Sequence, residues 1–179
     1  MSASEKQSVA LWSMLASALL AVSKLFAAAF TGSRGILSEA IHSVIDFGAT
    51  VITWFAIRWS DQPPDEQHHY GHAKIESIAA LVETGLLFVT TGWIVWEAVS
   101  RLITGESHVE VTWWAAAIIA VSILIDLNRS RALNRVAKKT SSEALEADAL
   151  HFSSDMWSSI VVLIGLGAVW YGVPAADAI

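Results

Sequence analysis

The sequence predicts an all-α membrane protein: an antiparallel bundle of transmembrane helices with five spans, the start of a sixth and a cytoplasmic N-terminus. Hydrophobic residues make up 54% of the 179 positions and charged residues 16%. A soluble domain of this length is less apolar and carries more charge. Long apolar runs recur along the chain, separated by short polar segments, and the mean hydropathy is +0.51. We therefore expect an integral membrane protein in contact with the lipid bilayer.

Five apolar runs are close to the ~20 residues that an α-helix needs to cross a bilayer. We place the spans approximately at residues 8–30, 36–59, 75–99, 111–127 and 147–171, with "GVPAADAI" starting a sixth. A cleavable signal peptide is the alternative for the first run, because "LFAAAFTGS" resembles a small-residue cleavage site. Lys24 inside that run and the four runs after it favour a span instead.

The basic residues predict the orientation of the spans. The segment 128–146, which we expect to be a loop, contains five of them: Arg129, Arg131, Arg135, Lys138 and Lys139. The loop between the first two spans contains only Arg34. Because an excess of lysine and arginine marks the cytoplasmic side, segments 60–74 and 128–146 are predicted cytoplasmic loops. Residues 1–179 then form one transmembrane domain with its N-terminus inside.

Two spans carry the same series of polar residues: an acid, a histidine three positions later and an aspartate four positions after that. The second span has Glu39, His42 and Asp46, and the fifth has Asp148, His151 and Asp155. Residues at this spacing share one helix face. Ionisable groups in a membrane are costly unless they are paired or line a polar cavity. The two spans run in opposite directions, so facing each other they bring each histidine level with an aspartate of the other helix.

Two imidazoles and two carboxylates that converge on one point suit a tetrahedral divalent cation, above all Zn²⁺. The absence of sulfur ligands argues against Cu(I), and four protein ligands suit Mg²⁺ poorly. The sequence thus predicts a metal site between spans two and five, formed by His42, Asp46, His151 and Asp155. A polar cluster with a purely structural role is the alternative.

The same segments resemble the cation diffusion facilitator (cation efflux) family. The resemblance lies in "LSEAIHSVIDFGATVI", "HHYGHAKIESIAALVE" and "EADALHFSSDMWSSIVVLIGL". It implies a divalent-metal/proton antiporter that exports Zn²⁺ from the cytoplasm, in a bacterial inner (plasma) membrane, with the four residues above as its transport site. Transport of Fe²⁺, Mn²⁺, Co²⁺ or Cd²⁺ is the alternative, as is a metal-sensing or structural membrane protein without transport.

Members of that family typically have six spans followed by a cytoplasmic metal-binding domain that supports dimerisation. This sequence ends shortly after the fifth span. We therefore expect it to be a fragment that lacks the C-terminal domain, and the intact protein to be a homodimer.

The loop "PPDEQHHYGHAK" contains a second candidate site. Asp65, His68 and His72 match positions that bind a further metal in some members of the family, and His69 could replace either neighbouring histidine. A solvated loop without specific binding is the alternative, since histidine-rich loops are commonly exposed. His108 is isolated, and we assign it no role.

Several functional classes are disfavoured. The chain has no cysteine, which excludes disulfides and thiolate sites. Its formal charge of −6 argues against nucleic acid as a partner. The His-Glu-x-x-His motif of a metalloprotease does not occur, so we expect no enzyme. Five charged residues have no assigned role: Lys24, Glu39, Glu83, Asp126 and Asp148.

Overall fold

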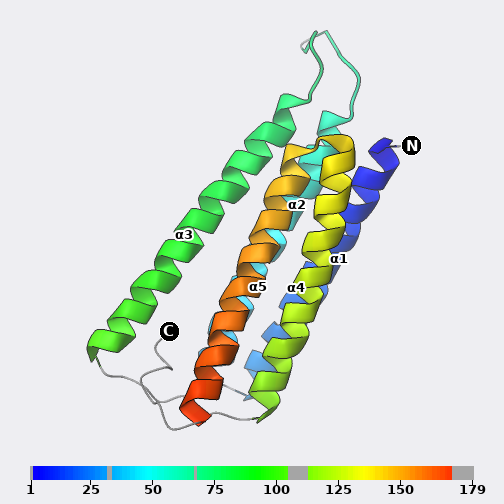
Figure 1. Cartoon of the computed structure of the whole chain (residues 1–179). Coiled ribbons are helices and arrows are strands. Elements are labelled where there is room, and N and C mark those ends of the chain that lie inside the picture. Colours follow the sequence, from blue (N-terminus) through cyan, green and yellow to red (C-terminus); the bar gives the residue numbers. More distant parts are fainter. Residues whose placement is uncertain (1, 32–33, 67, 105–112, 171–179) are drawn as a thin grey trace. The chain divides into compact units, whose positions relative to one another are not determined.

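The computed structural model describes residues 2–31, 34–66, 68–104 and 113–170. Within these ranges the chain forms α-helices and no strand (Figure 1). The helices are α1 (Ser2–Thr31), α2 (Arg34–Ser60), α3 (Lys74–Thr104), α4 (Trp113–Thr140) and α5 (Glu143–Trp170). The predicted start of a sixth span lies outside the described residues.

The predicted class, an all-α membrane protein, is confirmed. Among the described residues, three helical segments are long and apolar enough to cross a membrane: Ser4–Phe30, Ala40–Ser60 and Lys74–Trp96. Large apolar side chains such as Trp12, Leu19 and Phe30 of α1 are exposed, as a lipid-facing surface requires. The number of five spans and the cytoplasmic side of the loops stay predictions.

The chain divides into two compact units. The first consists of Met1–Glu83 and Ala132–Ala149, and the second of Thr84–Arg131 and Leu150–Ile179. The first unit therefore contains α1 and α2, the first turns of α3 and α5 and the last turns of α4. In this unit α1 packs against α2. Both helices bury small side chains, among them Ala10, Ala21, Ala40, Ala49 and Ala56. Small residues let membrane helices approach closely.

The segment 128–146 differs from the predicted loop because most of it is helical. It contains neither glycine nor proline, so nothing in it stops α4 before Thr140. Ser141 then adopts a left-handed conformation, with φ of 51°, and the Ser142 N–H donates to the Ala137 carbonyl at 3.2 Å. This pattern is a helix C-cap with serine in the position that glycine usually occupies. Only two residues separate α4 from α5.

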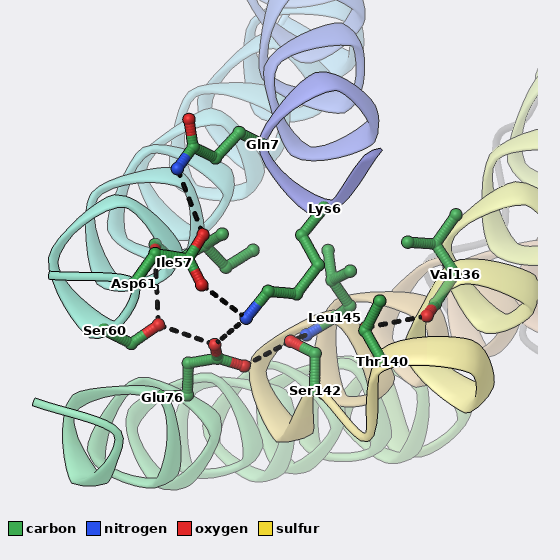
Figure 2. Close-up of polar contacts among 10 residues, drawn as sticks. All are labelled: Lys6, Gln7, Ile57, Ser60, Asp61, Glu76, Val136, Thr140, Ser142 and Leu145. Carbon is green, nitrogen blue, oxygen red and sulfur yellow. Dashed lines mark hydrogen bonds and ion pairs between the residues drawn. The ribbon is translucent and has the colours of Figure 1, made fainter. Parts of the chain in front are cut away.

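A cluster of charged side chains joins several helix ends of the first unit, as Figure 2 shows. The Lys6 ammonium of α1 lies 2.9 Å from Asp61 Oδ1, just after α2, and 2.7 Å from Glu76 Oε1 in the first turn of α3. Ser60 Oγ donates to Glu76 Oε1 at 2.6 Å, and Ser142 Oγ at the start of α5 donates to Glu76 Oε2. Glu76 thus links α1, α2, α3 and the α4–α5 junction.

This Lys6 cluster lies largely out of solvent, since the Lys6 side chain is only 12% exposed. One ammonium faces two carboxylates, and hydroxyl donors satisfy further carboxylate oxygens. A charge removed from water remains stable only while it is paired and hydrogen-bonded. Loss of one partner would therefore leave an uncompensated charge at these helix ends.

Replacing Lys6 with methionine is expected to lower the free energy of unfolding by about 3 kcal/mol, because two carboxylates remain buried together without their counter-ion. Thermal unfolding in detergent measures the effect. Lys139→Met is the matched control, since Lys139 pairs with Glu5 at 2.9 Å on an exposed surface, where a pair contributes less than about 1 kcal/mol. Equal effects of the two substitutions would contradict a special role for Lys6.

Candidate metal sites

The first histidine–aspartate pair lies on α2, in the first unit. His42 Nε2 is 3.7 Å from Asp46 Oδ1, and both side chains are partly buried. The helix itself produces this proximity, because residues four apart lie on successive turns of one face. In a tetrahedral zinc site with bonds of about 2.0–2.1 Å, two ligand atoms lie about 3.3 Å apart. The pair thus offers one nitrogen and one oxygen near the separation that a shared cation requires.

The second pair lies on α5, in the second unit. His151 Nε2 is 3.4 Å from Asp155 Oδ2, and the His151 side chain is 4% exposed. The His151 ring meets the Phe152 ring edge-to-face, with centroids 5.4 Å apart. The Arg129 guanidinium lies 3.6 Å from the centroid of the same Phe152 ring. The histidine is therefore held by an aromatic neighbour while its nitrogen faces the aspartate.

Each unit thus presents one imidazole nitrogen and one carboxylate oxygen on a single helix face. Each pair would supply two of the four predicted ligands. Because the two pairs belong to separate units, the meeting of all four residues at one cation stays a prediction.

The loop between α2 and α3 brings Asp65, His68 and His72 together. Asp65 Oδ1 lies 3.1 Å from His68 Nδ1, and Asp65 Oδ2 lies 3.3 Å from His72 Nε2. The centroids of the His68 and His72 imidazole rings are 4.4 Å apart. One ligand atom from each residue lies within 4.8 Å of the others. The three side chains are therefore gathered closely enough for one cation to draw them into its coordination shell.

Local backbone structure explains why these three residues meet. Pro63 and Pro64 cannot continue the hydrogen bonding of α2. The His68 N–H donates to Asp65 Oδ1 at 2.6 Å, which fixes the aspartate at the start of the turn. Gly71 has φ of 78°, a left-handed conformation that glycine adopts readily, and its N–H donates to the His68 carbonyl at 3.0 Å. The chain thereby returns to place His72 beside Asp65.

The loop trio has the composition of a solvent-accessible metal site. Asp65 and His68 are about half exposed, whereas the His72 side chain is 11% exposed. Two nitrogens and one carboxylate leave one tetrahedral position for water or another ligand. His69 is exposed and does not belong to the trio. His108 lies outside the described residues.

Changing His68 and His72 together to alanine is expected to remove about one bound zinc per chain. It should not abolish the zinc flux that the family resemblance implies, because neither residue is among the four predicted transport ligands. Metal analysis after dialysis and zinc flux into vesicles measure the two effects. His69→Ala is the matched control from the same loop and should change neither. Complete loss of flux in the double variant, with zinc still bound elsewhere, would make the loop an obligatory step.

The charged residues without a predicted role fall into two groups. Glu83 and Asp148 are each 1% exposed, whereas Lys24 and Asp126 are partly exposed. The side chain of Glu39 lies outside what the structure describes. The Lys6 cluster could not be found by sequence reasoning, because Lys6 and Glu76 are 70 residues apart and no local spacing joins them.

Comparison with known proteins decides the family. The sequence matches the cation efflux transmembrane domain over residues 10–179. This chain belongs to the cation efflux family. It is 34% identical over 174 residues to the cation-efflux pump FieF of Cronobacter sakazakii, and 36% identical over 169 residues to FieF of Salmonella typhi. These alignments cover 95% and 92% of this chain.

The resemblance drawn from the sequence motifs is therefore confirmed. The chain spans about half the length of the curated relatives it matches, 56% and 54% in these two cases. Membership in the cation efflux family and the apolar helices together identify an integral membrane protein. The relatives are bacterial, which agrees with the predicted bacterial membrane.

Proposed function

We propose that this chain is the transmembrane portion of a Zn²⁺/H⁺ antiporter that exports zinc from the cytoplasm. The transport site consists of His42, Asp46, His151 and Asp155. One observation carries the proposal: a cation efflux family member presents a histidine–aspartate pair on each of two helices, with nitrogen–oxygen separations of 3.7 Å and 3.4 Å. Its relatives bear the name cation-efflux pump.

The ligand types favour zinc among the divalent cations. Two imidazole nitrogens and two carboxylate oxygens form a borderline set, which suits tetrahedral Zn²⁺. Mn²⁺ prefers a set richer in oxygen and of higher coordination number, while Fe²⁺, Co²⁺ and Cd²⁺ can use the same ligands. We therefore take Zn²⁺ as the substrate and Fe²⁺, Co²⁺ and Cd²⁺ as its competitors.

Coupling to protons follows from the histidines. An imidazole binds metal only in its neutral form, so loading releases protons and protons compete with the cation. A site that opens alternately to each side then loads zinc where protons are scarce and releases it where they are abundant. Protons moving into the cytoplasm drive zinc out.

The loop trio has a supporting role in this scheme. Asp65 and His68 are accessible to solvent, so they can exchange metal quickly with the surrounding solution. On the predicted topology the loop is cytoplasmic, where it would collect zinc before transport. The intact protein is proposed to act as a homodimer.

Zinc affinity measured against pH tests the transport site. Because both histidines must be neutral, their deprotonation should contribute a rise in log affinity of about two per pH unit. Competition with a chelating dye reports the affinity of the intact protein at each pH. His42→Asn should reduce this slope by about one. An affinity that does not change with pH would exclude a site that contains both imidazoles.

A further inference from the structure

A buried carboxyl group in the first unit has no use in the site proposed above. Glu83 lies on α3, within the segment that is suited to cross a membrane, and is 1% exposed. Both of its carboxyl oxygens are buried without a hydrogen-bond partner among the described residues. An ionised carboxylate in such a place would lose its hydration and gain nothing in exchange.

Asp148 of α5 belongs to the same unit and lies close enough to Glu83 for their charges to interact. Asp148 is also 1% exposed. It differs from Glu83 in its polar contacts, because the Ser13 hydroxyl of α1 donates to Asp148 Oδ2 at 3.3 Å. Asp148 therefore accepts a hydrogen bond at one carboxylate oxygen, whereas neither oxygen of Glu83 does so among the described residues.

Two neighbouring carboxyl groups away from water do not both ionise, because each negative charge opposes the other. Such a pair holds one proton and titrates as a unit. The group that accepts a hydrogen bond retains the charge, and the group without a donor retains the proton. Burial and hydrogen bonding therefore assign the two residues different protonation states.

We propose that Glu83 and Asp148 form a proton-binding site, with the proton on Glu83 and the negative charge on Asp148. The site connects to transport through α5. Asp148 precedes the transport ligand His151 by three residues, less than one helical turn. A cation near His151 stabilises negative charge in its surroundings, so metal loading expels this proton. The expulsion of this proton on metal loading rests on the proposed antiport, and it would make Glu83 a third proton carrier beside the two histidines.

Infrared spectroscopy of the intact protein in lipid at neutral pH tests the proton site. We expect the carbonyl band of a protonated carboxyl group that shifts in heavy water and that shifts again when glutamate carries a carbon-13 label in its carboxyl group. Glu83→Gln should remove the band, and it should preserve thermal stability because the amide resembles the neutral acid in shape. Glu146→Gln, at an exposed position of α5, is the matched control and should leave the band unchanged.

A wild-type protein without the band, or a band that persists in Glu83→Gln, would overturn the proton site. The labelling result needs no substitution, so the test holds even if the variant folds poorly. For the link to transport, zinc should abolish the wild-type band, and Glu83→Gln should release about one proton fewer per bound zinc. A band that zinc leaves unchanged would contradict a role of Glu83 in the antiport. The proton site itself is judged by the band alone, so failure of the proposed transport and failure of the proton site are distinguishable.

Discussion

Asp155→Ala is expected to reduce zinc flux to background, a loss of about two orders of magnitude or more. Residues that merely support metal ligands already contribute about 10–100-fold to affinity or activity, and Asp155 is proposed to be a ligand itself. Its carboxylate lies 3.4 Å from His151 Nε2, so its removal leaves the imidazole without the oxygen ligand on the same helix face. Asp46→Ala should have the same effect through the α2 pair.

Zinc flux into vesicles that contain equal amounts of correctly inserted protein measures this loss. Ser158→Ala is the matched control, because Ser158 lies on an exposed position of α5 within one turn of Asp155. It should transport at the wild-type rate. Near-normal flux in both aspartate variants would exclude the proposed site.

The histidine–aspartate pairs could be predicted from the sequence because a single helix determines their geometry. A spacing of four residues within a helix brings His42 near Asp46 and His151 near Asp155, whatever the rest of the chain does. The apolar runs likewise predicted the helices that contain them. Sequence spacing does not determine how two helices approach each other. The four-ligand site is therefore proposed from the ligand chemistry of the two histidine–aspartate pairs.

The loop trio required more than spacing. Its residues were named from the resemblance to the cation efflux family, and the structure brings all three together through a turn at Gly71. Histidine content alone would have included His69, which lies outside the trio. Whether the trio binds metal stays a prediction.

The helical course of segment 128–146 was missed because its charges were interpreted as a loop. Charge determines which side of a membrane a segment occupies, but it does not stop a helix. α4 ends where Ser141 adopts a left-handed conformation, and serine is an uncommon residue for that position.

The Lys6 cluster and the Glu83–Asp148 pair were missed for a different reason. Their members come from different helices, so their proximity depends on how those helices pack. A lysine near the N-terminus and an acid on α3 give no local signal that they interact.

Zinc flux under an imposed proton gradient tests the central claim most directly. The intact protein is reconstituted into vesicles, the membrane potential is clamped, and zinc is supplied to the cytoplasmic face. An acidic lumen should drive zinc accumulation with proton efflux in step, because protons displace zinc from the two histidines on the luminal side. Collapse of the gradient with a protonophore should stop the accumulation. Zinc flux that is the same with and without the gradient would contradict antiport.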